Sequence, residues 1–82
     1  MIEWDKIALG YRVNGKPLTF NNGDRVRFVM GKTYQGRIET DTFAIKRDRR
    51  TRLATTYNIR FDSDFAVDCL IKFTDAESVT VV

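Results

Sequence analysis

The strand pattern that decides the fold is clearest in residues 55–61, which read TTYNIRF. Tyr57, Ile59 and Phe61 alternate with polar residues, and this period of two is typical of a strand with one buried face. Residues 25–30, which read RVRFVM, alternate in the same way and carry arginines at the polar positions. Both stretches therefore predict half-buried strands, the second with a basic outer face.

Turn residues divide the neighbouring sequence into short pieces. The Asn-Gly pair at residues 14–15 suits the two positive φ angles of a type I′ turn, so residues 11–20 predict a β-hairpin. Pro17 cannot donate a ladder hydrogen bond, which restricts its strand to a sheet edge. Residues 31–36, which read GKTYQG, predict a further turn that carries Tyr34.

The apolar residues in 37–46 do not follow a single alternation. Ile38 occupies an even position, whereas Phe43 and Ile45 occupy odd ones. A regular strand would place these side chains on opposite faces, since side chains alternate with a period of two. The sequence therefore predicts a bulge or kink near residues 40–42.

The remaining segments predict short elements. Apolar residues recur at helical spacing in residues 2–9, which favours a short N-terminal helix or an irregular lead-in. Residues 65–68 and 78–82 predict short strands, and residues 69–74 predict one 3₁₀ or helical turn. Five to seven short strands in 82 residues predict an all-β fold in a single domain, as a small barrel rather than a sandwich.

Two segments resemble the SH3-like small barrels of the KOW and Tudor kind. Residues 23–38, GDRVRFVMGKTYQGRI, resemble the G-D-x-V-x-V…G…G-x-V pattern that opens such barrels, although Gly31 and Gly36 lie one residue further apart than in typical KOW motifs. Residues 56–64, TYNIRFDSD, resemble the strand and turn found later in them. The resemblance implies an SH3-like barrel over residues 1–82. Such barrels bind nucleic acid, peptides and protein surfaces and are seldom enzymes on their own.

The composition excludes several kinds of chemistry. The chain has no histidine and one cysteine, so it can form neither an internal disulfide nor a His/Cys metal site. Cys69 has no histidine to activate it as a nucleophile, so we expect no enzymatic activity, no cofactor and no metal. Glu3 and Asp5 do not suit a signal peptide, and no apolar run approaches the length of a membrane span. We therefore expect a cytoplasmic protein that does not contact membranes.

Charge is distributed unevenly along the chain. Residues 1–60 hold 13 basic and 6 acidic residues, a net charge of +7, whereas residues 61–82 hold 1 basic and 5 acidic residues, a net charge of −4. The densest basic run is residues 46–52, KRDRRTR. Such a run is either a solvated hairpin loop or a surface that contacts phosphates, and the sequence leaves both readings open.

The basic residues on the predicted strands 25–30 and 37–46 and in this run, together with Tyr34, are the candidate binding residues. They are Arg25, Arg27, Tyr34, Arg37, Lys46, Arg47, Arg49, Arg50 and Arg52. Trp4 is read either as a cap on the barrel floor or as an exposed contact. The run itself contains no aromatic residue, which argues against base stacking there. The function expected is a non-enzymatic module that contacts nucleic-acid phosphates, or alternatively a small accessory or inhibitory subunit that binds a protein. The oligomeric state stays open.

Overall fold

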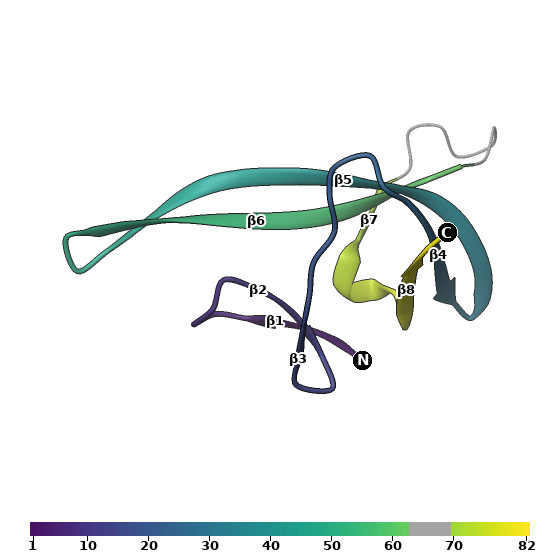
Figure 1. Cartoon of the computed structure of the whole chain (residues 1–82), viewed down its shortest axis with the longest axis horizontal. Helices are drawn as coiled ribbons and strands as arrows, with labels where there is room; N and C mark the ends of the chain where they lie inside the picture. The colour runs from purple at the N-terminus through teal and green to yellow at the C-terminus, as the bar shows by residue number, and fades with distance from the viewer. Residues whose placement is uncertain (63–69) are drawn as a thin grey trace.

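The computed structural model describes residues 1–62 and 70–82, which form eight strands and one 3₁₀ helix in two antiparallel sheets (Figure 1). The smaller sheet has the order β1-β2-β3, from β1 (Ile2–Asp5), β2 (Gly10–Val13) and β3 (Lys16–Leu18). The larger sheet has the order β7-β6-β5-β4-β8. Its strands are β4 (Arg25–Met30), β5 (Lys32–Arg47), β6 (Arg50–Phe61), β7 (Leu70–Lys72) and β8 (Ser78–Val81). The 3₁₀ helix η2 (Phe73–Asp75) lies between β7 and β8, and the all-β prediction is confirmed.

The core lies where the two sheets face each other. Its fully buried large side chains are Phe28, Phe73, Ile38, Ile59 and Val26. Ile38 and Ile59 are directly opposed across β5 and β6, so both point to the same side of the sheet. Burial of these apolar surfaces supplies most of the stabilisation, at about 25 cal/mol per Å².

Aromatic rings join the two sheets. Tyr11 on β2 stacks on Tyr57 of β6, with ring centroids 5.2 Å apart, and lies 4.8 Å from Phe73 of η2. Phe20, in the connection between β3 and β4, meets the rings of Tyr57 and Phe73 edge-on. Offset and edge-to-face pairs add to the stabilisation that burial alone provides, so this cluster fixes the smaller sheet against the larger one.

The predicted first hairpin is confirmed. Asn14 and Gly15 have φ angles of 50° and 77°, as a type I′ turn requires, and they connect β2 to β3. Pro17 lies on β3, which is an edge strand of the smaller sheet, opposite Arg12. An edge strand tolerates a residue that lacks an N–H donor.

The predicted N-terminal helix is wrong. Residues 2–5 form strand β1, which pairs with β2 from Ile2 opposite Val13 to Asp5 opposite Gly10. The helical spacing corresponds instead to a single turn over residues 6–9, closed by a 2.8 Å hydrogen bond from the N–H of Leu9 to the carbonyl of Asp5. One turn does not repay the cost of nucleating a helix, whereas pairing with β2 satisfies the backbone and buries Ile2.

The turn predicted over residues 31–36 is also wrong. The chain reverses at Gly31, whose φ is 72°, and β5 begins immediately afterwards at Lys32. Tyr34 therefore lies within a strand, opposite Phe28, and the two rings stack with centroids 5.7 Å apart. A glycine at a left-handed φ can reverse the chain with few residues, so the second glycine of this segment is not needed for the turn.

The predicted bulge near residues 40–42 is wrong. The pairing of β5 with β6 runs without interruption from Gly36 opposite Phe61 to Arg47 opposite Arg50. Ile38 is fully buried, whereas 43% of Phe43 is exposed. No bulge is needed because β5 extends beyond the core. Ile38 is buried on the face that covers the core, whereas Phe43 lies on the other face, further along the strand.

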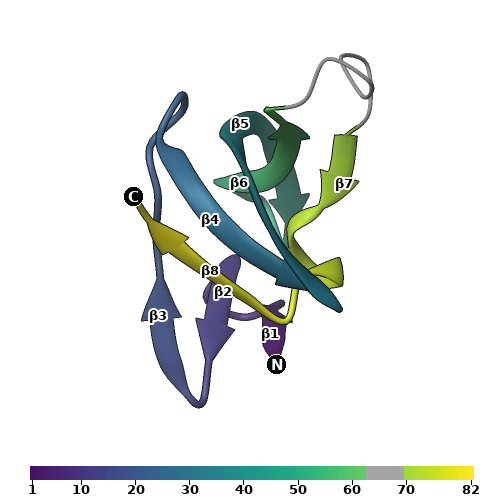
Figure 2. The same ribbon diagram turned by 90° about the vertical axis from the view of Figure 1, so that its right-hand side faces the viewer.

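The small barrel predicted from the sequence is not closed in the residues that the structure describes. The larger sheet is open there, since β7 and β8 are its two edges and do not pair with each other, and β1 to β3 form a separate sheet. Figure 2 shows β4 and β8 on one side of the molecule and β7 on another. The helix η2 at residues 73–75 overlaps the 3₁₀ turn predicted over residues 69–74. The described strands exceed the predicted five to seven, partly because residues 2–5 add one. The strand predicted over residues 65–68 lies outside the described residues.

Candidate functional site

The most prominent feature of the surface is a long hairpin that projects from the body of the protein (Figure 1). Pairing of β4 with β5 ends at Arg37, and pairing of β7 with β6 ends at Asn58. Beyond these points β5 and β6 continue as a two-stranded ribbon, and we call residues 41–56 the arm. From residue 41 to residue 47 the arm extends about 20 Å, at about 3.3 Å per residue.

The end of the arm is a tight turn formed by Asp48 and Arg49. Their φ angles are 52° and 64°, so both residues adopt the left-handed conformation of a type I′ turn. This turn matches the twist of the flanking strands, but its left-handed conformation is sterically unfavourable for non-glycine residues. The run that the sequence presents as a loop is therefore two strand ends joined by two residues, which holds its charges on an ordered scaffold.

Five of the predicted basic residues lie at or next to this turn, namely Lys46, Arg47, Arg49, Arg50 and Arg52. Directly opposed residues of an antiparallel pair share a face, so Arg47 with Arg50 and Ile45 with Arg52 lie on one face of the arm. Lys46 belongs to the other face. None of the five forms an ion pair with any residue in ranges 1–62 and 70–82. The arm therefore presents a concentrated positive charge to the solvent.

A groove of about 670 Å³ lies between the arm and the turn that follows β1. Its residues are Trp4, Lys6, Ile7 and Leu9 on one side and Ile45, Arg47, Asp48, Arg50 and Arg52 on the other. The basic residues outnumber the acidic ones by four to one, and the rest of the lining is apolar. This volume falls within the range of ligand-binding clefts, and a lining of this kind suits an anionic ligand with flat or apolar parts.

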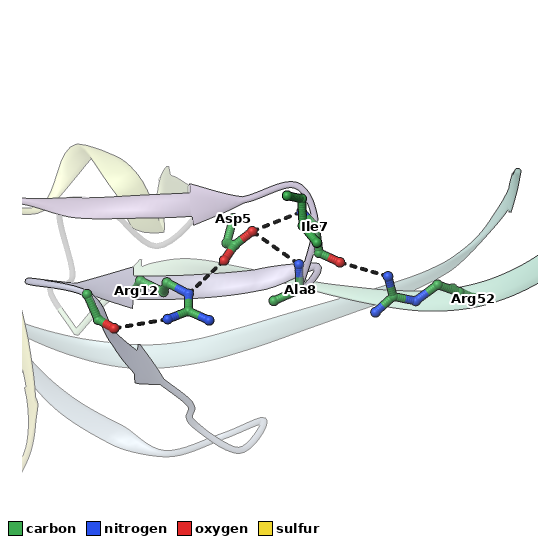
Figure 3. A network of polar contacts seen from close by, with 6 residues as sticks. Asp5, Ile7, Ala8, Arg12 and Arg52 are labelled. Atoms are coloured by element: carbon green, nitrogen blue, oxygen red, sulfur yellow. Dashed lines mark hydrogen bonds and ion pairs between the residues drawn. The ribbon is translucent and has the colours of Figure 1, made fainter.

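One hydrogen bond joins the two sides of the groove, and further polar contacts order the turn on one side. Arg52 of β6 donates a 2.7 Å hydrogen bond to the carbonyl oxygen of Ile7 (Figure 3). Asp5 caps the turn, since its Oδ1 accepts hydrogen bonds from the N–H groups of Ile7 and Ala8 at 2.9 and 3.1 Å. Its Oδ2 forms a 2.7 Å ion pair with Arg12. The N–H of Ala8, then that of Ile7 and then the guanidinium of Arg12 hold the pKa of the Asp5 carboxyl below its ordinary value.

A second hollow of about 410 Å³ continues the groove toward the body of the protein. Trp4 and Ile45 line both hollows, and Phe43 and Lys72 line the second one. Trp4 is half-buried, and its ring meets that of Tyr11 edge-on with centroids 4.9 Å apart. The two hollows share Trp4 and Ile45 in their linings, and we call them together the channel.

The remaining predicted residues lie elsewhere. Arg25, Arg27 and Arg37 are exposed on the outer face of β4 and β5, and Arg25 is opposite Arg37. About 33 Å of strand separates Arg37 from Arg47, so this group does not join the arm in one site. Tyr34 packs against the rings of Phe28 and Phe61 and retains 37% exposure.

Charges on this outer face are partly compensated. Asp62 lies 4.0 Å from Arg25, and Glu39 forms an ion pair with Arg60. A hydrogen bond from Arg60 lowers the pKa of the Glu39 carboxyl. The outer face therefore alternates in sign, in contrast to the groove.

No protein-family model, curated protein or solved structure matches this chain. Within the described ranges, no three His, Cys, Asp or Glu side chains come together to hold a metal ion. Those ranges also contain no helix that is long and apolar enough to cross a membrane.

Sequence reasoning missed the residues that complete the groove. Lys6, Ile7, Leu9, Phe43 and Ile45 were not among the candidate binding residues, and Trp4 was left between two readings. One signal was present, because Phe43 and Ile45 are apolar residues on the same strand face as Arg47. The contribution of residues 4–9 has no counterpart in the local sequence, since it depends on how the smaller sheet packs.

Proposed function

We propose that this protein is a non-enzymatic binding module whose arm contacts the phosphates of nucleic acid. Lysine and arginine side chains near phosphates release condensed counterions, and this release gives affinity without demanding a particular base sequence. Arginine also binds phosphate oxygens through two parallel N–H groups. The absence of histidine supports a binding role over an acid–base catalytic one.

One observation carries the proposal, namely the cluster of arginines at the end of a projecting arm. Arg47, Arg50 and Arg52 line one groove, and no carboxylate of the described residues forms an ion pair with them. Arg52 uses one N–H group on the carbonyl of Ile7 and keeps others for a ligand. Uncompensated positive charge lowers stability by self-repulsion, so its concentration here is better explained by an anionic partner than by the fold.

The arm is a stronger candidate for this contact than the outer face of the larger sheet. Arg25, Arg27 and Arg37 also carry positive charge, but Asp62 lies beside Arg25 and Glu39 is the next outward residue along β5. Acidic neighbours repel phosphates and reduce the potential at the surface. We assign the outer face a secondary, non-specific contribution to binding.

The test is fluorescence anisotropy of labelled 20-nucleotide DNA and RNA with the 82-residue chain, across a series of salt concentrations. We expect the logarithm of the affinity to fall linearly with the logarithm of the salt concentration. The variant R47E/R49E/R50E should lose at least about tenfold in affinity and show a salt slope smaller by about one unit for each lost contact. The matched control R25E/R27E/R37E changes the charge equally and should lose several-fold less.

Two results would overturn the proposal. One is the absence of binding at low salt in the wild-type chain. The other is binding whose affinity does not respond to salt, or which R47E/R49E/R50E leaves unchanged. Equal losses in both triple variants would show that net charge, rather than the arm, determines affinity. Circular dichroism should confirm that each variant keeps its strand content.

An acidic protein partner is the alternative function, and exposed apolar side chains favour it. Ile7 is 84% exposed beside the groove, and Leu53 on the opposite face of the arm is 72% exposed. Such residues anchor protein interfaces more readily than phosphate contacts do. A pull-down in which the partner survives nuclease treatment would support this alternative, and loss of the partner after nuclease would support nucleic acid.

The proposal includes the SH3-like fold and a cytoplasmic location. The order of β4 to β7, followed by a 3₁₀ helix and a final strand that returns to β4, supports the resemblance to small barrels. The location rests on the single cysteine, which suits a reducing compartment. Cell fractionation followed by immunoblotting would test the location, since the protein is expected in the cytosolic fraction.

A further inference from the structure

Trp4 occupies a position in the groove that phosphate contact alone does not explain. Its ring packs on Tyr11 and on the edge of the core, and it also lines both hollows beside the arm. The core therefore supports the indole on one side, and open space lies on the other. A large aromatic side chain held in this way presents a rigid apolar surface at little cost in conformational entropy.

Apolar residues of the arm extend this surface. Phe43 and Ile45 lie on the same strand face as Arg47, and Ile45 lines both hollows with Trp4. Aromatic and aliphatic side chains thus line one part of the inner hollow, beside the polar residues Thr56, Asn58, Lys72 and Thr74, while arginines occupy the part near the end of the arm. A ligand that fills both parts must combine flat apolar groups with negative charge.

The spacing of the arginines suits a chain of phosphates. Arg50 and Arg52 lie two residues apart on β6, and Arg47 is opposite Arg50 on β5. Alternate residues of a strand are about 6.6 Å apart. This distance is similar to that between neighbouring phosphates of an extended single strand, so successive phosphates could each meet one guanidinium.

We infer that the groove binds single-stranded nucleic acid, with phosphates on Arg47, Arg50 and Arg52 and a base stacked on the indole of Trp4. The inference rests on the proposed function and adds the strandedness of the ligand and the role of Trp4. Stacking on aromatic side chains tolerates any base, because every base has a flat π-face. The bases of a duplex stack on one another and are not available to Trp4, which gives the preference for single strands.

The single tryptophan of the chain supplies a direct measurement, since Trp4 is the only source of indole fluorescence. We expect 15-nucleotide oligo(dT) to quench Trp4 emission, and inorganic polyphosphate to bind the arm with little quenching. A hairpin duplex of the same number of phosphates should bind at least several-fold more weakly than oligo(dT). Anisotropy of labelled oligonucleotides measures these affinities independently of Trp4.

Substitutions of Trp4 separate stacking from apolar burial. W4L keeps an apolar side chain without a π-face and should lose roughly 5- to 150-fold in affinity for oligo(dT), the range that one stacked base contributes. W4F keeps a ring and should restore most of the binding. Both variants should retain similar affinity for polyphosphate. Since both replace the tryptophan with a smaller residue, thermal melts should confirm that each remains folded.

The results that overturn the inference differ from those that overturn the proposed function. Equal binding of W4L and W4F to oligo(dT), quenching of Trp4 by polyphosphate as strong as by oligo(dT), or equal affinity for the duplex would each refute it. In all three cases salt-dependent binding through the arm would survive. If no nucleic acid binds at low salt, the proposed function itself fails.

Discussion

The hydroxyl of Tyr11 accepts a 3.1 Å hydrogen bond from the backbone N–H of Tyr57. Tyr57 lies on β6 one residue before the segment that pairs with β7, at the edge where the sheet loses its neighbouring strand. A side chain from the smaller sheet thus takes the place of a missing strand. Tyr57 in turn accepts a 3.2 Å hydrogen bond from the N–H of Phe20, so the two tyrosines connect both sheets at the base of the arm.

Replacing Tyr11 by phenylalanine should therefore destabilise the fold. Y11F keeps the ring stack but leaves a buried N–H group unpaired, at a cost of about 1–3 kcal/mol in the free energy of unfolding. Tyr34 is the matched control, since no hydrogen bond to its hydroxyl is present among the described residues, and Y34F should change stability by less than about 0.5 kcal/mol. Urea unfolding followed by circular dichroism measures both. Equal effects would mean that the Tyr11 hydroxyl bond contributes nothing.

Gly36 allows β5 and β6 to approach each other closely. A Cβ atom at this position would lie 2.3 Å from the carbonyl oxygen of Arg60 and 3.0 Å from Cγ2 of Ile59, so the backbone would have to shift. We expect G36A to lower the free energy of unfolding by about 1–3 kcal/mol. Gly10 is the control, because a Cβ there would meet no atom within 4 Å. G10A should be neutral or slightly stabilising, and a similar loss in both variants would rule out the steric explanation.

The hydrogen bond from Arg52 to the carbonyl of Ile7 should limit opening of the groove. R52A is expected to increase the hydrogen-exchange rate of the Leu9 amide about fivefold, because about 1 kcal/mol of local stabilisation is lost. R50A removes the same charge from the groove without removing this bond and should leave that rate unchanged. Amide exchange measured by NMR distinguishes the two variants. Equal rates in both would show that the hydrogen bond from Arg52 to Ile7 does not limit opening of the groove.

Asp5 should make stability depend on pH in the acidic range. Its folded pKa lies below the ordinary value of 3.8, so the native state binds fewer protons than the unfolded state near that pH. The stabilisation is therefore present above the unfolded pKa and is lost as pH falls through the folded one. The melting temperature of D5A should lie below that of the wild type at pH 7, and the difference should shrink toward pH 3. A constant difference across this range would show that the Asp5 charge is not involved.

Local patterns predicted the parts of the fold that depend on neighbouring residues. The alternation of Val26 and Phe28, and of Tyr57 and Ile59, correctly identified core positions, and all four are buried. The Asn-Gly turn was also correct, since it needs only two positive φ angles. The pattern failed for residues 2–9 because the helical spacing and the strand pairing compete, and only contact with β2 decides between them.

The candidate site was likewise predicted in part from the sequence. The sequence identified the arginines around residue 49, because clustering of charge is visible without a structure. It also grouped Arg37 with them, and the uninterrupted extension of β5 separates the two. The alternation of apolar and polar residues does not predict how far a strand extends past the buried core, because residues in the exposed extension need not be apolar.

The sequence by itself determined the all-β composition, the type I′ turn at residues 14–15 and the polarity of charge along the chain. Only the tertiary structure brought Trp4 to Arg50 and Arg52, from opposite ends of the first 52 residues. The physical reason is that turn geometry and side-chain alternation act over a few residues, whereas the groove arises from the packing of two sheets. That packing depends on contacts such as Tyr11 with Tyr57, which are distant in sequence and are fixed by the shape of the whole core.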